Sequence, residues 1–337
     1  MKFEIESDFR ALGTDIDIRT VVDDEAEREK ARDDLKKAKD IFFFKEKIFS
    51  RFDANSEICK LNKNLGIWQK ASPDILYLAG RALYYNDISG GLYDPRVIEV
   101  LEKIGYDKDF KSKDFSKIDS PPEFSANKIK LSDDLKIKNN KIFFAVKMDF
   151  SGIAKGYIVD QAVEFLKSCG WKNFLVDAGG DMMISGANSE GKKWRIAVEG
   201  IPEDKLMLEI SDKGIATSGI SRKKWQIKGK KFHHLVNPMS PNEFSYELRT
   251  VSVIAENTEN ADGRAKTLVL MGKERGLQFA KKNKISAIFL DYKENIFITP
   301  EAKKYCPFLT SNVRILKNTL CKVLKFHGIG ISSGQAP

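Results

Sequence analysis

The positions of apolar and polar residues along the chain predict an alternation of strands and helices. Residues 3–22 alternate apolar and polar side chains around Leu12-Gly13-Thr14, which predicts an initial β segment with a glycine kink. Asp23-Asp24 is expected to cap a long charged helix that runs from about Glu25 to Phe49. The polar residues 55–62 are interpreted as a loop.

The rest of the chain is expected to be organised around one stretch, Met148–Ile184. An apolar run leads into Asp149, a turn of small residues covers 151–156, and a helix pattern then extends from Ile158 to about Cys169. A loop of small residues at a helix N-terminus suits an anion such as phosphate, because it offers free N–H groups and the positive end of the helix dipole. This stretch alone is a weak signal, since it is neither a Walker A loop nor a dinucleotide fingerprint.

Other elements follow the same periodicities. Helices are predicted over 74–86, 97–104, 259–271 and 273–282, and strands over 194–198, 206–210, 215–218, 225–231, 250–255, 287–290 and 296–298. Residues 106–141 are interpreted as a surface meander with two edge strands. Because antiparallel-looking strands mix with helices, we expect an α+β fold with mixed or antiparallel sheets and flanking helices. No clean linker is visible, so 1–310 is expected to form one two-lobed unit followed by a basic tail, 311–337.

Composition narrows the classes of function. The chain has 337 residues, 42% of them hydrophobic, and a net charge of +9, which permits an anionic ligand without identifying one. No zinc-finger or RNA-binding signature occurs, so no nucleic-acid partner is expected. The four cysteines are scattered, which favours a reducing compartment over a disulfide framework. The N-terminus lacks the apolar region of a secretory or lipoprotein leader, and a cytoplasmic location is expected.

The C-terminal tail contains a basic amphipathic pattern. In residues 313–326, apolar positions share one helical face and basic positions lie largely off it. The preferred interpretation is a terminal helix docked on the body of the protein. The alternative is a helix lying on an anionic membrane surface, which would give the protein a peripheral membrane contact.

Several separated motifs then form an ordered series. They are Ala11–Thr14, Ser50–Phe52, Ser56–Ile58 with Leu61-Asn62, Gly91–Pro95, Asp149–Tyr157, Asp177–Asp181, Ala216–Gly219, His233–Pro238 and Ala261–Gly272. Together they resemble the ApbE family of flavin transferases, over roughly residues 9–300. The resemblance implies an α+β fold with FAD bound in a cleft between two lobes and Mg²⁺ on its pyrophosphate. It also implies cleavage of FAD, transfer of FMN to a threonine hydroxyl of a target flavoprotein, and release of AMP.

The resemblance further implies roles for individual residues. FAD contacts are expected from the following residues: Leu12, Phe52, Leu92, Tyr93, Asp94, Asp149, Lys155 and Leu235. The Gly152 carbonyl and the Asp262 carboxylate match metal ligands, and His234 matches a histidine linked to the chemistry. A histidine with a pKa of roughly 6.5 suits removal of the acceptor proton. His233 and His234 occupy alternating positions, so at most one of them is expected to face the cleft.

Two positions depart from the family pattern. Most members have a threonine four residues after the metal aspartate, but this chain has Lys266 there and Thr267 next to it. Three alternatives follow: Thr267 is the metal ligand, Lys266 contacts phosphate, or water completes the metal shell. Asn237 stands where an aspartate is usual after the histidine. Two other functions use the same site, an FAD pyrophosphatase that gives FMN and AMP and a non-catalytic FAD-binding protein.

Overall fold

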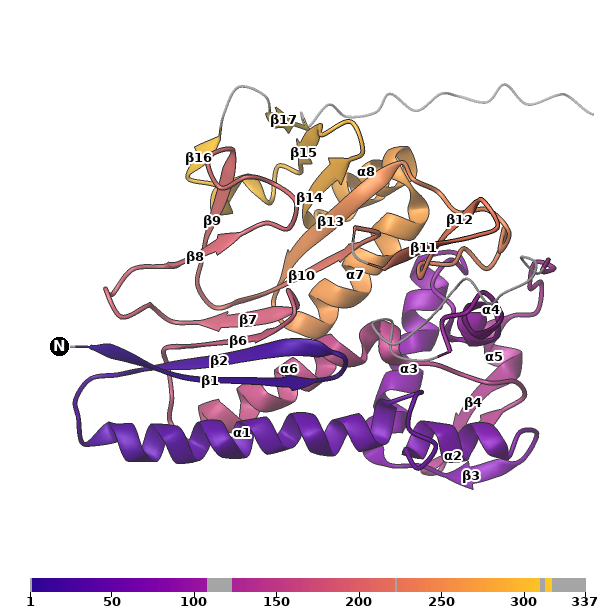
Figure 1. Ribbon diagram of the computed structural model, residues 1–337, viewed down its shortest axis with the longest axis horizontal. Coiled ribbons are helices and arrows are strands. Elements are labelled where there is room, and N and C mark those ends of the chain that lie inside the picture. Colours follow the sequence, from indigo (N-terminus) through magenta and orange to yellow (C-terminus); the bar gives the residue numbers. More distant parts are fainter. Residues whose placement is uncertain (1, 108–122, 222, 310–312, 317–337) are drawn as a thin grey trace, which may run out of the picture.

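The computed structural model describes residues 2–107, 123–221, 223–309 and 313–316, and its centre is a nine-stranded sheet (Figure 1). Its strands, in spatial order, are β1 (Phe3–Ala11), β2 (Thr14–Val22), β6 (Phe174–Ala178), β7 (Met182–Ser185), β10 (Lys213–Gly219), β13 (Leu248–Ala255), β14 (Ser286–Asp291), β15 (Ile296–Ile298) and β17 (Val313–Ile315). Neighbouring strands are antiparallel except for β15 and β17. The predicted α+β class is confirmed, since helices and mainly antiparallel sheets are mixed along the chain.

Four helices cover one face of this sheet (Figure 1). They are α1 (Glu27–Phe49), α6 (Ser151–Ser168), α7 (Thr258–Met271) and α8 (Lys273–Lys282). Ile16 and Ile18 of β2 are buried against this helical layer together with Leu35 and Phe42 of α1. The other face is covered by a three-stranded sheet of β8 (Trp194–Ala197), β9 (Leu206–Ile210) and β16 (Phe308–Leu309). Burial on both faces explains why the central strands are rich in apolar residues.

The predicted β segment over 3–22 is a hairpin, so the expectation of one kinked segment is wrong. Leu12 and Gly13 both have a positive φ, 54° and 71°, and form the turn between β1 and β2. Two successive residues of this kind define the tight turn that matches the twist of paired strands. The Leu12 N–H donates to a Glu46 carboxylate oxygen at 2.8 Å, which fastens the hairpin tip to α1.

Two predicted loops are helical. Residues 57–63 form α2 (Glu57–Lys63), because the Ser56 hydroxyl accepts the Cys59 N–H and caps the helix. The small residues 151–156 form the first turns of α6 instead of a loop before it. The sequence pattern missed this because Ser, Gly and Ala give no apolar periodicity, although they leave room for a neighbouring helix. The positive end of the α6 dipole therefore lies at Ser151, several residues earlier than predicted.

A smaller lobe stands beside the end of the large sheet (Figure 1). It contains α2, α3 (Pro73–Ile88), α5 (Leu131–Asp134) and a three-stranded sheet of β3 (Trp68–Lys70), β5 (Lys141–Phe144) and β4 (Leu135–Lys138). The two edge strands expected within 106–141 correspond to β4 and the start of β5, and residues 108–122 of that region lie outside the described residues. One buried cluster of side chains extends from β2 and α1 to α3 and β5, so it joins the two lobes.

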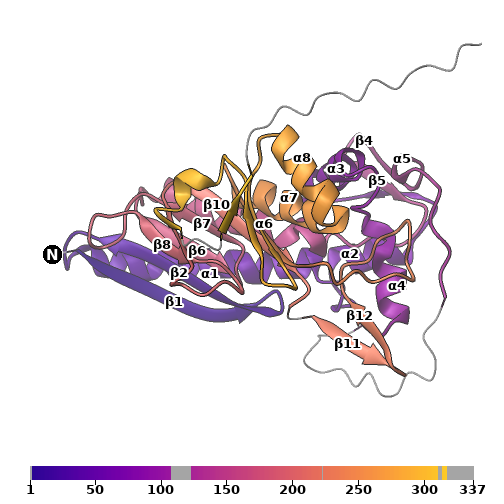
Figure 2. The ribbon, with the colours of Figure 1, turned by 90° about the horizontal axis from the view of Figure 1, so that it is seen from above.

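A hairpin, β11 (Lys224–Ile227) and β12 (Lys230–His233), extends beside α4 (Ile98–Lys103), which follows a short 3₁₀ turn, Pro95–Val97 (Figure 2). Trp225 and Phe232 of the hairpin are buried with Leu101 and Ile104, and the indole N–H of Trp225 donates to the Ile104 carbonyl at 2.9 Å. The hairpin carries His233 at its end, so this packing fixes the direction in which the chain leaves β12 toward His234.

The helix predicted over 313–326 is wrong at its start, because Val313–Ile315 forms β17 and pairs in parallel with β15. The rest of that segment lies outside the described residues, so its membrane contact and the domain division at residue 310 stay predictions. Within the described ranges, no helix is long and apolar enough to cross a membrane. In the described part of the chain, Cys59, Cys169 and Cys306 are free thiols.

Candidate functional site

The candidate site begins at the N-terminus of α6, which Asp149 holds in place. Its two carboxylate oxygens accept the Ser151 N–H and the Ser151 hydroxyl, both at 2.8 Å. Arg51 lies 3.5 Å from the same carboxylate through its Nε, and both side chains are buried. The Asp149 carboxylate therefore fixes the first turn of α6 and the position of Arg51. Its predicted contact with FAD stays a prediction.

Helix α7 crosses α6 in close contact at Gly156. A Cβ atom at this position would lie 2.7 Å from the Thr258 carbonyl oxygen and 2.9 Å from the Glu259 Cα atom. Asp160, one turn further along α6, accepts the backbone N–H groups of Thr258 and Glu259 at 2.8 and 2.9 Å. These contacts set the register of α7 against α6, and they bring Asp262 beside the start of α6.

Asp262 and Lys266 face this crossing from α7. The Asp262 side chain is almost fully buried, and one of its oxygens accepts the Gly156 N–H at 3.4 Å. Its other oxygen lies 3.4 Å from the Lys266 ammonium, one helical turn away. The Lys266 side chain lies over Gly152, since a Cβ atom on that glycine would lie 3.5 Å from Lys266 Cδ. Lys266 therefore lies next to both Gly152 and Asp262, the two residues expected to ligate a metal ion.

Lys155 contributes a second ammonium group on the next turn of α6. It forms an ion pair with Asp181, which lies in the turn between β6 and β7. Burial lowers the pKa of Lys155 to about 8; the Asp262 charge opposes this shift, and the positive charges of Lys266 and Lys223 add to it. The three lysines therefore lie close enough to repel one another. Such a group of cations is suited to a ligand with several negative charges.

His234 lies beside the same lysines, whereas His233 does not. Burial lowers the pKa of His234 well below its ordinary value, and the charges of Lys223 and Lys266 lower it further. Its Nδ1 lies 3.4 Å from the Lys223 carbonyl oxygen. His233 is buried against Phe244, and its Nε2 lies 3.0 Å from the Ser245 carbonyl oxygen. The expectation that at most one of the two histidines faces the site agrees with this separation.

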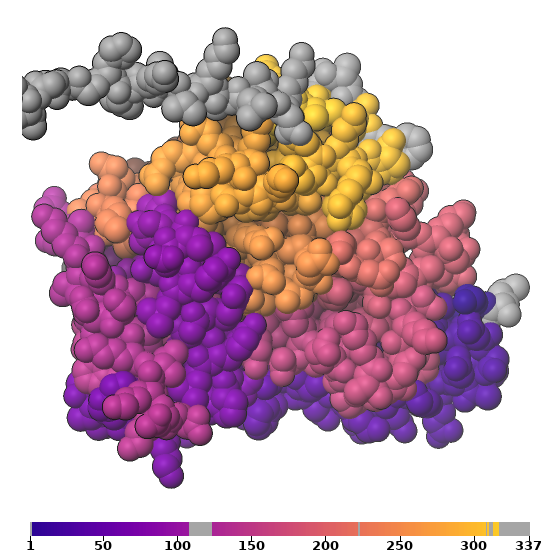
Figure 3. Space-filling model, turned by 180° about the vertical axis from the view of Figure 1, so that it is seen from behind, coloured from indigo at the N-terminus to yellow at the C-terminus, as the bar shows by residue number. Residues whose placement is uncertain are grey.

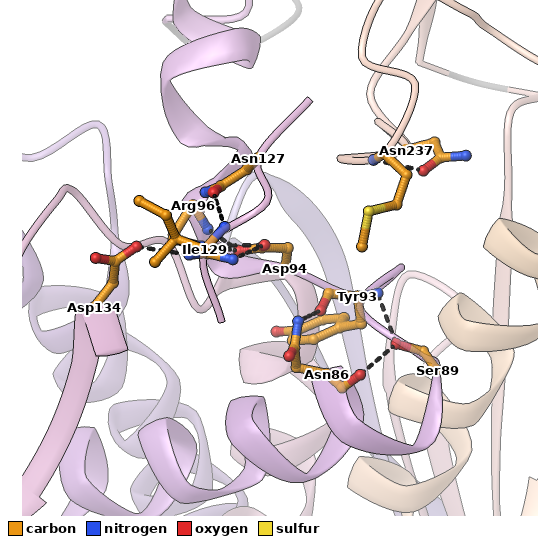
Figure 4. A network of polar contacts seen from close by, with 10 residues as sticks. Asn86, Ser89, Tyr93, Asp94, Arg96, Asn127, Ile129, Asp134 and Asn237 are labelled. Carbon is orange, nitrogen blue, oxygen red and sulfur yellow. Dashed lines mark hydrogen bonds and ion pairs between the residues drawn. The ribbon is translucent and has the colours of Figure 1, made fainter. Parts of the chain in front are cut away.

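The segment Leu92–Asp94 forms the wall nearest to α3. The Tyr93 backbone N–H donates to the Ser89 hydroxyl at 2.9 Å, and its carbonyl accepts from Asn86 at 2.8 Å (Figure 4). Asp94 accepts hydrogen bonds from the Arg96 backbone N–H and from the Arg96 guanidinium, whose Nη2 atom lies 2.6 Å from Asp94 Oδ2. Both oxygens of Asp94 thus serve the local turn, and its predicted FAD contact stays a prediction. Leu92 is buried.

The remaining predicted contacts lie around this centre. Leu12 lies in the hairpin turn, partly buried against the main core. Phe52 is 45% exposed, and the Arg51 guanidinium lies against both its ring and that of Tyr106, 4.6 and 4.4 Å from the two centroids. Leu235 lines a separate cavity of about 210 Å³ together with His233. No described interaction brings Leu12, Phe52 or Leu235 into direct contact with Lys155, Lys223 or Lys266.

A larger cavity, of about 990 Å³, adjoins the turn between β6 and β7. Its lining includes Gly179 and Gly180, next to the Asp181 that holds Lys155. Among the described residues, its lining has six carboxylates and no lysine or arginine: Asp8, Asp15, Asp17, Asp177, Glu199 and Glu203. Phosphate groups are disfavoured beside so many negative charges. A phosphorylated ligand is therefore expected to place its phosphates near the lysines and not among these carboxylates.

The residues present do not fit a protein-held magnesium ion. Mg²⁺ requires several oxygen ligands in near-octahedral geometry. The described residues contain no group of three or more His, Cys, Asp or Glu that could hold a metal, so a metal ion here would depend on Asp262, on backbone carbonyls or hydroxyls, and on the phosphates of the ligand. One Asp262 oxygen is already paired with the Lys266 ammonium. Thr267, five residues after Asp262, lies about 140° around the helix from it, and its hydroxyl is buried without a hydrogen-bond partner. Thr267 as a metal ligand stays a prediction that helical geometry opposes.

Three residues of the site were missed or undervalued from the sequence. From the sequence, Arg51 is as compatible with packing as with ligand contact, Asp181 is compatible with a cap of the Gly179-Gly180 turn, and Lys223 belongs to none of the motifs. The run Ser221–Lys224, which follows the Ala216–Gly219 motif directly, is the signal that could have indicated Lys223. Arg51 and Asp181 act through partners far away in sequence, Asp149 and Lys155, which no local pattern reveals.

The fold is that of solved ApbE structures. Over 90% of this chain, a flavin transferase ApbE from Vibrio cholerae superposes with a TM-score of 0.73 at 21% identity, covering 100% of that chain. The apbe protein of Thermotoga maritima does so with a TM-score of 0.75 at 23% identity, over 90% of this chain and 99% of that one. The model of the ApbE family matches residues 12–289, and the chain belongs to this family.

Related sequences carry one functional name. A protein from Haemophilus influenzae named FAD:protein FMN transferase is 27% identical over 268 residues, which are 76% of this chain and 78% of that protein. Its Vibrio cholerae namesake is 32% identical over 167 residues, 48% of this chain and 50% of the relative. The match thus extends over most of the first relative and half of the second.

Proposed function

We propose that this protein transfers the FMN part of FAD to a threonine hydroxyl of a partner flavoprotein and releases AMP. The observation that carries the proposal is the group of Lys155, Lys266 and His234 near the N-terminus of α6. It combines cations for a pyrophosphate with a neutral base. Relatives named FAD:protein FMN transferase support the same reaction.

The reaction is a phosphoryl-type transfer, in which the protein mainly positions groups and neutralises charge. The acceptor oxygen bonds to the phosphorus of the FMN part. The bond between that phosphorus and the bridging oxygen breaks, and AMP leaves with the bridging oxygen and its electron pair. Lys155 and Lys266 stabilise the negative charge on the pyrophosphate, and the acceptor proton goes to His234. The Mg²⁺ ion implied by the family resemblance stays a prediction, and no step requires it.

His234 suits the role of base because its environment keeps it neutral. The pKa of His234 is lowered by burial and by the neighbouring lysine charges, so the imidazole is unprotonated at neutral pH. If its Nδ1–H donates to the Lys223 carbonyl, Nε2 is left free to accept a proton. The positive charges that keep His234 neutral would also bind the pyrophosphate, and the bound anion would offset their effect when the proton arrives.

The decisive experiment follows both products. The full chain is incubated with FAD and a threonine-containing flavoprotein acceptor peptide, while AMP is measured by chromatography and the acceptor mass by mass spectrometry. AMP release with a gain of one FMN mass supports the transferase. AMP release without a mass gain would assign the FAD pyrophosphatase activity instead, and bound FAD without AMP would assign a non-catalytic binder.

The role of His234 can be separated from binding. His234→Ala is expected to slow transfer by about 10²–10⁴-fold, the usual contribution of a general base, while the Kd for FAD changes far less. Calorimetric titration with FAD provides the binding readout. Equal losses in binding and in rate would contradict the role of base.

A further inference from the structure

The surroundings of Gly152 have the composition of an anion site that lacks a place for a metal ion. The Lys266 side chain and the Tyr93 ring both lie over Gly152, with Lys266 Cδ and Tyr93 Oη each 3.5 Å from where its Cβ would be. The ammonium of Lys266 lies 3.4 Å from Asp262, the residue expected to ligate the metal. A monovalent cation on a side chain thus stands beside the carboxylate where a divalent ion was expected.

Lys266 is held there by the fold. It lies one helical turn after Asp262 on α7, so both side chains are on the same face of that helix. Its side chain is 17% exposed, and that of Asp262 is 3% exposed. The contact of α7 with Gly156 and the capping of α7 by Asp160 fix this face against the start of α6. A metal ion at Asp262 would have to displace the ammonium or lie directly against it, with repulsion between their charges.

Tyr93 supplies an independent sign of a place for a hydrogen-bond acceptor. Its side chain is buried, and its hydroxyl has no hydrogen-bond partner in the described structure. Burial and the charges of Asp149 and Asp262 raise the pKa of this phenol well above its ordinary value, so it remains a donor. An unsatisfied buried hydroxyl costs free energy unless a ligand completes it. A phosphate oxygen between Tyr93 and Lys266 would satisfy both groups.

We propose that Lys266 takes the place of the divalent cation in this protein, so that the pyrophosphate of FAD is bound by Lys266, Lys155 and the Tyr93 hydroxyl without a metal ion. This inference rests on the proposed function for the identity of the ligand. The α6 N-terminus adds the positive end of its dipole to the same site, although the Ser151 N–H is already taken by Asp149 and the Ile153 N–H by the Phe150 carbonyl. Asp262 then orients the Lys266 ammonium instead of ligating a metal.

The consequence for the reaction concerns only the charge on the phosphates. The bonds that form and break are those of the proposed transfer, and the leaving AMP still takes the bridging oxygen with its electron pair. The ammonium of Lys266 donates hydrogen bonds to the oxygens that become more negative as AMP leaves. The binding of FAD and the release of AMP should both proceed in the presence of a chelator.

The test measures FAD binding by calorimetry on the full-length protein, once in EDTA and once with Mg²⁺, and measures metal in the isolated complex by elemental analysis. The wild-type protein should bind FAD equally well in both conditions and retain no stoichiometric metal. Lys266→Thr should weaken binding in EDTA by about 10- to 100-fold, as expected for loss of a charged hydrogen bond, and added Mg²⁺ should restore part of it. Lys266→Arg should remain resistant to EDTA.

The matched control is Lys282→Thr, which removes the same charge from an exposed position at the end of α8. It should bind FAD like the wild-type protein. Thermal unfolding establishes that each variant is folded; if Lys266→Thr is not, the wild-type metal content and Lys266→Arg still decide.

The outcomes separate this inference from the proposed function. Loss of wild-type FAD binding in EDTA, restored by Mg²⁺ with stoichiometric metal in the complex, overturns the inference and leaves the transferase standing. Unchanged binding by Lys266→Thr in EDTA also overturns it. Metal-free FAD binding without AMP release or acceptor mass gain refutes the transferase alone. Failure to bind FAD under either condition refutes both.

Discussion

Replacing Gly156 by alanine would place a Cβ atom in the closest contact between α6 and α7. The new atom would lie 2.7 Å from the Thr258 carbonyl oxygen and 2.9 Å from the Glu259 Cα, which are backbone atoms that cannot rotate away. Overpacking of this kind costs about 1–3 kcal/mol. Alanine also gains about 0.5–1 kcal/mol of helix propensity over glycine. Gly156→Ala is therefore expected to lower the free energy of unfolding by up to about 2.5 kcal/mol.

Gly80→Ala isolates the contact from the propensity. Gly80 lies within α3, is exposed, and has no heavy atom within 4 Å of the position of a Cβ. This variant should gain the propensity alone and unfold at a higher temperature than the wild type. The two variants should differ by about 1–3 kcal/mol, or roughly 2–6 °C in Tm at about 2 °C per kcal/mol.

The assay is thermal unfolding followed by circular dichroism, with FAD titration as a second readout. Because α7 carries Asp262 and Lys266, moving it away from α6 should also weaken FAD binding in Gly156→Ala but not in Gly80→Ala. An equal rise in Tm for both variants would refute the reasoning, since it would mean that α7 moves away from α6 at no cost. Unchanged FAD binding in a destabilised Gly156→Ala would show that the site does not depend on this helix contact.

Three further predictions concern charge. Burial lowers the pKa of His233 to about 4, so the unfolded chain binds more protons than the folded one between about pH 6.5 and 4. The free energy of unfolding should therefore fall by about 3 kcal/mol as the pH drops through this range. Urea unfolding should show a flatter pH dependence in His233→Gln, and an unchanged slope would assign the pH dependence to other groups. The pKa of Lys155 is lowered to about 8, so the ammonium loses its charge and FAD affinity should fall as the pH rises through about 8. Lys155→Arg should move this fall to higher pH in calorimetric titrations. Identical pH profiles of the two proteins would contradict the role of the Lys155 charge. Arg81 pairs with the buried Glu259 through a 3.0 Å contact where α3 borders α7 (Figure 3). Arg81→Met should therefore destabilise the protein by about 3–5 kcal/mol, because it leaves a buried charge without its partner. A loss below 1 kcal/mol in urea unfolding would show that Glu259 becomes protonated or hydrated instead.

The sequence predicted most of the regular elements because their apolar positions repeat with clear periods. The long helix was expected from about Glu25 to Phe49 and extends from Glu27 to Phe49. Prediction from periodicity failed where small residues carry no such period, as in 151–156. It also failed where one capping residue starts a short helix, as at Ser56. The tail helix failed at Val313–Ile315 because an edge of the sheet offers these residues backbone partners that a sequence pattern cannot reveal.

The site was predictable in part through the ordered family motifs. Lys155 and Asp262 come near each other because α6 and α7 cross, although more than a hundred residues separate them in the chain. Lys266 was visible as a departure from the family pattern, but its pairing with Asp262 depends on the helix face and on burial. The unpartnered hydroxyl of Tyr93 depends on the packing around it, and no single-sequence pattern contains that information.

The nine-stranded sheet ends at two strands whose outer sides are protected by different means. At one end the short β17 covers β15, which shortens the edge that remains. At the other end β1 carries Glu4, Glu6 and Asp8 at alternating positions along the terminal strand. A second copy of the chain adding to this edge would have to remove these charged side chains from water, which opposes strand-to-strand self-association and aggregation. The acidic side chains of β1 thus help to keep a protein with such a large sheet from polymerising through its edge.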